Sequence, residues 1–157
     1  MAGSRISVLI VEARFYEDIA DEMLKGAKAA IEAAGGTATV IGVPGALEIP
    51  TALEFHLKGC AGVGGDHDAY VALGCVIRGE TTHHEHVGRE CMQGLSRLAH
   101  EHLIALGNGV LTCETVEQAW ARARIDGHDK GGVAARAALH MMNLRKTLYL
   151  APRGVHA

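Results

Sequence analysis

The sequence predicts an α/β fold in which helices cover both faces of a four-stranded parallel sheet. Short apolar runs alternate with longer amphipathic stretches along the chain. One run, residues 69–77, is apolar almost throughout, which is typical of a strand buried on both faces. Parallel strands need crossover connections, and the amphipathic stretches supply them as helices in right-handed crossovers. With no linker or internal repeat, the 157 residues are expected to form one domain over 1–157.

The first half of the chain has clear strand and helix signals. After a short apolar run, Ile19, Met23 and Ala27 share one face of a helical stretch, which the pair Gly35-Gly36 ends. Pro50 suits the first turn of a short helix, because that turn leaves its N–H groups unpaired in any case. The elements predicted here are strand 6–11, helix 18–34, strand 37–43, a short helix to about residue 57 and a loop over 59–68.

The second half repeats the alternation. Val87, Cys91 and Leu95 recur on one face of a long helical stretch. Thr115 and Gln118 have the spacing of a capping box, which predicts a helix that starts after Thr115. The elements predicted here are strand 69–77, helix 82–106, strand 109–113, a broken charged stretch over 124–130 and a last helix over 131–146.

The composition indicates which kinds of partner and which cellular compartment to expect. The chain is 48% hydrophobic and 21% charged, with a net charge of −3 and no basic tract, so nucleic acid is not expected as the main partner. No apolar run reaches the ~18 residues of a membrane span, and no signal peptide is seen. The cysteines lack a Cys-x-x-Cys pair, and reduced thiols in a cytoplasmic protein are expected. They are Cys60, Cys75, Cys91 and Cys113.

The segment after strand 69–77 carries the strongest functional signal. It passes from the apolar run into a polar, histidine-rich turn at the carboxyl end of the strand, where open α/β sheets bind ligands. Gly79 lets backbone approach a ligand closely, and Thr81 and Thr82 are candidate caps of a helix whose N-terminus attracts phosphate. His83 can move protons near neutral pH. The segment therefore predicts a phosphate site beside a proton donor.

Four more residues have both a structural and a functional interpretation. Phe15 is either core or a flat face for an aromatic ligand ring. Glu48 either complements a helix dipole or accepts hydrogen bonds from ligand hydroxyls. Arg122 and Lys130 are either solvated charges or ligand contacts, and arginine suits bidentate phosphate binding.

Metal and cofactor motifs are not found in the sequence. The histidine-rich segments 83–86 and 100–102 do not fit H-E-x-x-H, because Gly88 and Ile104 stand where the second histidine is needed. We therefore expect no metal site, and His84 and His86 are interpreted as solvated. Glycine-rich dinucleotide and P-loop motifs are also missing, so no nucleotide cofactor of these two kinds is expected.

Five blocks stand in order along nearly the whole chain. They are Ala13-Arg-Phe15, Pro44-Gly-Ala-Leu-Glu-Ile-Pro50, Ala72-Leu-Gly-Cys-Val-Ile-Arg-Gly-Glu-Thr-Thr-His83, Gly109-Val-Leu-Thr112 with Glu117-Gln-Ala119, and Asp129-Lys-Gly131. Together they resemble the 6,7-dimethyl-8-ribityllumazine synthase family.

The resemblance implies a three-layer αβα, flavodoxin-like fold with strand order 2-1-3-4. It implies a transferase of riboflavin biosynthesis that condenses 5-amino-6-(ribitylamino)uracil with 3,4-dihydroxy-2-butanone 4-phosphate to 6,7-dimethyl-8-ribityllumazine and releases phosphate. It implies no metal or redox cofactor. It also implies a homopentamer whose active sites lie between subunits.

By position, the resemblance also implies residue roles. His83 is the catalytic proton donor and acceptor. Glu80 and Thr81 bind the butanone phosphate through backbone amides, and Arg122 of an adjacent subunit clamps it. The residues implied on the pyrimidine and ribityl side are Phe15, Ala46, Leu47, Glu48, Cys75, Val76, Ile77 and Lys130.

The sequence departs from the family pattern at two places. Asn108 stands just before the predicted fourth strand, where many members have an aromatic residue that faces the substrate ring of a neighbouring subunit. The stretch 124–131 keeps only the final Lys-Gly of the glycine–lysine loop found in many shell-forming members. With only about five residues before the first predicted strand, these features favour a pentamer over a sixty-subunit shell.

Two other functions fit parts of the sequence. A flavin- or lumazine-binding paralogue without useful catalysis would keep the pocket, and Asn108 leaves that alternative open. A flavodoxin-like regulator would need several acidic residues after the first strand, whereas Glu12 stands alone there.

Overall fold

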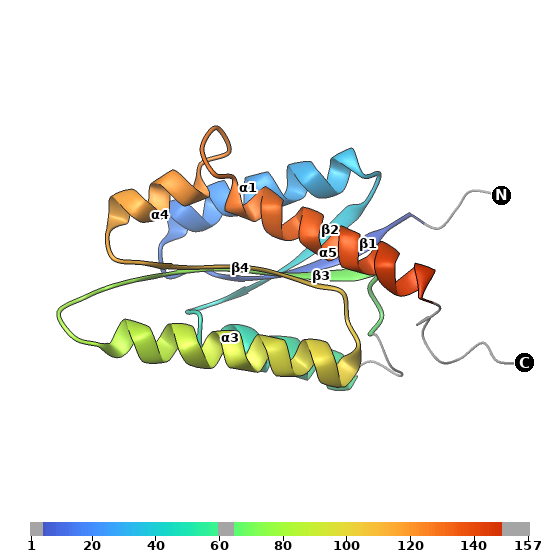
Figure 1. The fold of residues 1–157 in the computed structure, drawn as a ribbon, viewed down its shortest axis with the longest axis horizontal. Coiled ribbons are helices and arrows are strands. Elements are labelled where there is room, and N and C mark those ends of the chain that lie inside the picture. The colour runs from blue at the N-terminus through green and yellow to red at the C-terminus, as the bar shows by residue number, and fades with distance from the viewer. Residues whose placement is uncertain (1–4, 60–64, 149–157) are drawn as a thin grey trace, which may run out of the picture.

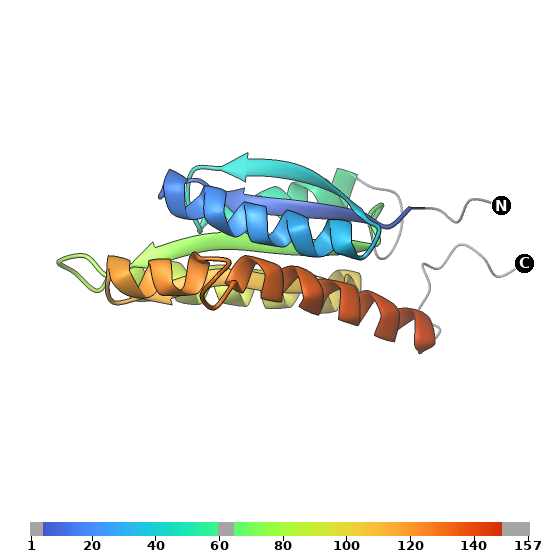
Figure 2. The same cartoon turned by 90° about the horizontal axis from the view of Figure 1, so that it is seen from above.

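The computed structural model describes residues 5–59 and 65–148, and it has the predicted α/β class. A four-stranded parallel sheet with the order β2-β1-β3-β4 lies between two layers of helices (Figure 1). Seen from above in Figure 2, α1 and α5 run side by side across one face. The elements are β1 (Ser7–Ala13), α1 (Glu17–Ala33), β2 (Thr37–Val43), α2 (Glu48–Gly59), β3 (Ala69–Ile77), α3 (His83–His102), β4 (Leu106–Cys113), α4 (Val116–Ala123) and α5 (Lys130–Thr147).

The strands β1 and β3 form the centre of the sheet. Val11 of β1 pairs with Ile41 of β2 on one side and with Ala72 of β3 on the other. From β1 the chain crosses to β2 on one side and then returns past β1 to β3, so the strand order reverses between β1 and β3. The crevice beyond the carboxyl ends of strands at such a reversal is the usual ligand site of an open α/β sheet.

Successive side chains of the central strands point to opposite faces of the sheet and pack into two separate hydrophobic cores. Ile10 and Leu73 point to the layer of α1, α4 and α5, where they pack with Met23. Leu9 points to the layer of α2 and α3, where it packs with Leu95. Because both faces of the sheet are covered, β1 and β3 are buried along almost their whole length, as their near-continuous apolar sequences predict.

The predicted boundary between the third helix and the fourth strand is wrong. The predicted helix over 82–106 is too long, since α3 ends at His102, and β4 begins at Leu106 and not at residue 109. Leu103 ends the helix in a left-handed conformation with φ of 53°, which few side chains favour and no local signal predicted. Gly107 belongs to the strand, because its missing side chain lets α5 approach: a Cβ there would overlap the carbonyl oxygen of Ala134.

The other predicted elements match to within a few residues. The bounds of β2 and β3 are as predicted, and α2 is longer than expected, with Pro50 in its first turn. The predicted N-cap bond of α4 is formed, since Thr115 Oγ1 accepts from the amide of Gln118 at 3.2 Å. The Gln118 carboxamide oxygen accepts from the amide of Glu114 at 2.9 Å, one residue before the position that a full capping box uses. Residues 60–64 of the predicted loop 59–68, Cys60 included, lie outside the described residues.

Within residues 5–59 and 65–148, none of the helices combines the length and the apolar character needed to cross a membrane. Three cysteines in this part of the chain, Cys75, Cys91 and Cys113, are free and buried, as expected of reduced thiols.

The contact between β4 and α5 predicts a large effect of one methyl group. Gly107→Ala should destabilise the fold by about 1–3 kcal/mol, because the added Cβ meets backbone of α5 that cannot move without shifting the helix. The measurement is the free energy of unfolding from urea denaturation. Gly59→Ala is the matched control, since no described atom lies within 4 Å of a Cβ there, and it should change stability by less than about 1 kcal/mol. Equal stability of the two variants would contradict the assigned close packing.

Candidate functional site

A cavity of about 460 Å³ opens at the carboxyl ends of β1, β2 and β3. This volume is in the range of small-molecule sites, and the lining is mostly apolar with a few polar groups. Its walls come from the end of β3, from the segments that follow the three strands and from the first turn and a half of α3. The lining residues are Phe15, Tyr16, Pro44, Gly45, Ala46, Leu47, Glu48, Cys75, Val76, Ile77, Gly79, Thr81, His83, His84 and Val87.

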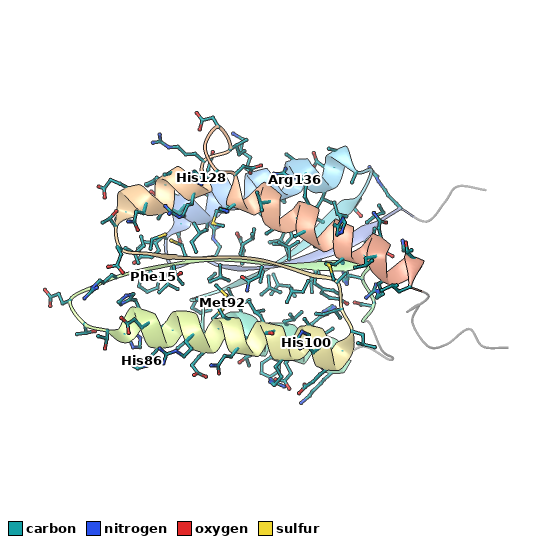
Figure 3. All side chains as sticks on the ribbon, in the orientation of Figure 1. Phe15, His86, Met92, His100, His128 and Arg136 are labelled. Carbon is teal, nitrogen blue, oxygen red and sulfur yellow. The ribbon has the colours of Figure 1, made fainter. Side chains whose placement is uncertain are left out.

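One wall is an aromatic ring that the chain leaves uncovered. Phe15 follows β1 and is 70% exposed, although it is among the largest apolar side chains of the protein. Its ring meets that of Tyr16 edge to face, with centroids 5.0 Å apart and an interplanar angle of 69°. Figure 3 shows Phe15 on the side of the sheet that carries α3. An exposed ring held at a cavity wall offers a flat face to an aromatic ligand.

A second wall is the turn that leads from β2 into α2. The amide of Glu48 donates to the carbonyl of Gly45 at 3.2 Å, so the turn runs directly into the helix. Ala46 is buried, whereas Leu47 and Glu48 are exposed at the cavity. This arrangement places a carboxylate beside the apolar wall, where it can accept hydrogen bonds from ligand hydroxyls.

The third side is the end of β3 and the start of α3. Cys75, Val76 and Ile77 line the cavity, and beyond them the position of Gly79 is open, with no described atom within 4 Å of a Cβ built there. Thr82 is the N-cap residue but makes no side-chain cap bond. Instead Thr81 Oγ1 accepts from the amide of His83 at 3.4 Å. The amide dipoles of this 20-residue helix favour an anion at its first turn, next to the His83 imidazole.

The cysteine in the cavity wall is not a nucleophile at neutral pH. Burial raises the pKa of the Cys75 thiol to about 12, with a smaller contribution from the neighbouring Cys113. Burial also raises the pKa of the Cys113 thiol. Cys75 therefore contributes shape and backbone to the cavity, and His83 is a residue of its lining whose side chain is suited to proton transfer near neutral pH.

The structure brings together most of the residues that the sequence predicted for the site. Nine of them line the cavity, and Tyr16, His84 and Val87 join them although sequence reasoning did not single them out for it. Their positions follow from simple rules, since Tyr16 follows Phe15 and Val87 lies one helical turn after His83. The predicted residues that line the cavity are Phe15, Ala46, Leu47, Glu48, Cys75, Val76, Ile77, Thr81 and His83.

Four predicted site residues lie outside the cavity of this chain. Glu80 is exposed in the turn before α3. Arg122 is on α4, where its guanidinium donates to the carbonyl of Gln118 at 3.0 Å, and Lys130 is the first residue of α5. Both helices cover the sheet face opposite to α2 and α3 (Figure 1).

Asn108 is the fourth of these residues, and its predicted place before the fourth strand is wrong. It lies within β4, opposite Ala72 of β3, and its side chain is exposed. Its carboxamide oxygen accepts from the amide of Val110 at 3.0 Å, and its nitrogen lies 2.9 Å from the sulfur of Met92 on α3. The strand begins earlier than predicted because its glycines pack against α5, so a loop-like sequence forms an edge strand.

Comparison with known proteins gives one family over nearly the whole chain. A family model described as 6,7-dimethyl-8-ribityllumazine synthase matches residues 5–146. The chain is 55% identical over 143 residues to 6,7-dimethyl-8-ribityllumazine synthase 1 of Rhizobium meliloti, which covers 91% of this chain and 94% of that protein. It is 54% identical over 145 residues to the synthase of Agrobacterium fabrum, covering 92% and 98%, and 56% identical over 146 residues to that of Azorhizobium caulinodans, covering 93% and 89%.

The raised pKa of Cys75 predicts a protected thiol. At pH 8, a thiol with a pKa of about 12 is ionised in about one molecule in ten thousand, whereas an ordinary cysteine is about a quarter ionised. Iodoacetamide should therefore leave Cys75 unmodified in the folded protein and alkylate it after unfolding in urea, as measured by peptide mass spectrometry. Rapid alkylation of Cys75 in the folded protein would show that its thiol is accessible and ionised.

Proposed function

Because the chain belongs to the 6,7-dimethyl-8-ribityllumazine synthase family, we propose that the cavity at the carboxyl edge of its sheet is where the two substrates of that enzyme condense. The substrates are 5-amino-6-(ribitylamino)uracil and 3,4-dihydroxy-2-butanone 4-phosphate. The observation that carries the proposal is the junction, in one cavity, of an uncovered aromatic ring, a carboxylate and a helix N-terminus next to a histidine.

The pyrimidine substrate fits the half of the cavity between Phe15 and the end of β3. Its ring stacks on Phe15, and its polar edge meets the backbone of Cys75, Val76 and Ile77, whose peptide groups can donate and accept hydrogen bonds. The ribityl chain then extends along Ala46 and Leu47 to Glu48, which accepts from its hydroxyls. In this assignment the aromatic wall stacks on the ring, the strand backbone binds its polar edge, and the carboxylate binds the hydroxyls.

The phosphate of the second substrate fits the first turn of α3. Backbone amides of Glu80 and Thr81 and the helix dipole attract a dianion, and they do so without a buried charge in the free protein. When phosphate leaves, the negative charge that develops on it is already stabilised by these groups. The cavity therefore holds the anion in the same place before and after the bond breaks.

His83 moves the protons of the condensation. The amine of the pyrimidine attacks the ketone carbonyl and water leaves to give a Schiff base. Phosphate then departs, and the ribityl-bearing nitrogen closes the second ring with loss of a second water. His83 is at the boundary between the two substrate positions, so its imidazole can take a proton from one reacting group and return it to another. Holding both substrates side by side supplies a further part of the rate.

A second copy of the chain completes the site in this proposal. Arg122 and Lys130 carry the charges that the family uses for the phosphate and the ribityl chain, and in one chain they lie on helices that cover the other face of the sheet. A ring in which each cavity faces α4 and α5 of its neighbour brings the two sets together. Asn108 of the neighbour then faces the pyrimidine ring, in place of the aromatic residue of many members.

We place this enzyme in the cytoplasm, in keeping with its free buried cysteines.

No observation favours the alternative of a binding paralogue without catalysis. His83, Glu48, Arg122 and Lys130 are all present in the sequence. The deciding assay mixes the purified protein with both substrates and follows the absorbance and fluorescence of the lumazine. Product formation above the uncatalysed rate is expected, and its absence would contradict the proposed function.

His83→Ala should slow the condensation by about one to two orders of magnitude. General acid–base catalysis is worth about 10² to 10⁴, and the lower end applies here because the two substrates already react with each other without enzyme. The measurement is kcat at saturating concentrations of both substrates. A variant with the wild-type kcat would exclude His83 from the mechanism.

Arg122→Ala should affect the butanone phosphate more than the pyrimidine. A charge-assisted contact is worth roughly 1.5–3 kcal/mol, or about ten- to a hundredfold in kcat/KM for the phosphate substrate. Arg122→Lys should recover only part of the loss, because lysine lacks the planar fork. If the steady-state parameters for the phosphate substrate do not change in Arg122→Ala, the assigned contact does not exist.

The purified protein should be a pentamer and not a shell. Five chains of 16.5 kDa give a particle of about 82 kDa, whereas sixty give one near a megadalton. The stretch between α4 and α5 carries the bulky charged residues Arg124, Asp126 and His128 in place of the compact glycine–lysine loop of many shell formers. Light scattering on freshly purified protein measures the mass, and a dominant species near a megadalton would refute this prediction.

A further inference from the structure

Two histidines and one carboxylate meet at the other end of the sheet, where α2 ends and β3 begins. Nε2 of His56 lies 2.7 Å from Oδ1 of Asp66, and Nδ1 of His67 lies 2.6 Å from the same oxygen. All three potential ligand atoms lie within 4.8 Å of one another. The imidazole rings are largely buried, with side-chain exposures of 20% for His56 and 14% for His67, whereas Asp66 is 53% exposed.

The backbone around this cluster is held in place by buried groups. Tyr70 is 1% exposed, and its hydroxyl accepts from the amide of His67 at 3.2 Å. Its ring packs edge to face against both imidazoles, with centroid separations of 6.2 Å to His56 and 5.8 Å to His67. Gly65 has a φ of +70°, and a Cβ there would overlap the Tyr70 hydroxyl, so this turn requires glycine.

A second tie fixes the turn from its other side. Asp68 accepts from the amide of Ser7 through Oδ2 at 2.8 Å, and its carbonyl accepts from the guanidinium of Arg145 at 3.0 Å. The two histidines are therefore positioned by packing and hydrogen bonds before any ligand arrives. Preorganised imidazoles that share one oxygen are the arrangement expected of a cation site whose ligands need little movement.

We propose that His56, Asp66 and His67 bind a divalent transition-metal ion, with Zn²⁺ as the preferred occupant. Imidazole nitrogen and carboxylate oxygen are the ligand types that Zn²⁺ takes in tetrahedral sites, at about 2.0–2.2 Å. Ligand atoms of such an ion lie about 3.3 Å apart, so the Asp66 oxygen would move outward by roughly 0.6 Å to admit it. That residue is the exposed member of the three, and its carboxylate can make this adjustment toward solvent.

The proposed metal site is separate from the substrate cavity. His67 precedes β3 and Gly79 follows it, and the nine residues of the strand span about 30 Å. With three ligands from the described residues, the proposed site takes water in its fourth position, so the ion would exchange with solvent and a chelator would remove it. The expected role is to tie the end of α2 to the start of β3, and the condensation reaction does not need it.

The test uses the full-length protein without a histidine tag, stripped with a chelator and titrated with ZnCl₂ in a calorimeter. The wild type should bind one Zn²⁺ per chain at this site. His67→Ala and Asp66→Asn should each weaken that binding at least tenfold, because loss of even an outer-shell partner costs about 10–100-fold in metal affinity. Asp66→Asn keeps the size of an exposed side chain, so it decides the test if His67→Ala folds poorly.

His100→Ala is the matched control, since His100 is exposed on α3 and outside the cluster (Figure 3). It should bind Zn²⁺ like the wild type, and Zn²⁺ should raise the melting temperature of both. Co²⁺ in place of Zn²⁺ should give the strong visible absorption of a tetrahedral site in the wild type and lose it in Asp66→Asn. A wild type that binds no Zn²⁺, or equal binding by wild type and Asp66→Asn, would overturn the proposal.

Discussion

The pairing of β1 with β3 is the contact on which the rest of the molecule depends. It places two strands in register that are far apart in sequence, with Val11 opposite Ala72, and it makes the strand order reverse at the centre of the sheet. Because both strands are buried on both faces, their carboxyl ends cannot shift independently. The loops that leave them therefore hold Phe15 and His83 at one cavity, although each side chain is itself exposed.

A close contact between two helix backbones fixes the other half of the proposed site. A Cβ at Gly131 would overlap the carbonyl oxygen of Met23, so α5 lies directly against α1. Asp129 starts α5 by accepting from the amide of Gly132 at 3.1 Å. Lys130 sits between these two anchors and has a defined position on the surface of the chain. A short segment thus serves both packing and, in the proposed ring, a neighbour's ligand.

The sequence predicted the bounds of an element well wherever a characteristic residue, such as glycine or proline, stands at its end. The limits of β2 and β3 follow from glycine, proline and charged residues at the ends of apolar runs, and the Thr115 cap follows from its spacing to Gln118. The end of α3 was missed because a leucine in the left-handed conformation ends the helix, where glycine is the usual signal. The start of β4 was missed because Gly107 is explained only by the approach of α5.

The same distinction applies to the candidate sites. Sequence patterns predicted the strand ends that meet at the cavity, because parallel strands bring their carboxyl ends to one edge. They could not place Arg122 relative to that edge, since in the proposed ring its distance depends on a second chain. Nor did they find the cluster of His56, Asp66 and His67, because it joins the end of α2 to the start of β3 through tertiary contacts that include the buried ring of Tyr70.

The central claim is that each cavity is completed by a neighbouring chain, and mixed rings test it most directly. One inactive parent carries Glu48→Ala with His83→Ala, and the other carries Arg122→Ala. Unfolding the two together and refolding them in equal amounts should restore about a quarter of the wild-type activity, since a quarter of the interfaces then pair an intact cavity with an intact Arg122. Activity in the mixture no higher than the mean of the two parents, with mixed rings confirmed by mass spectrometry, would show that each chain builds its site alone.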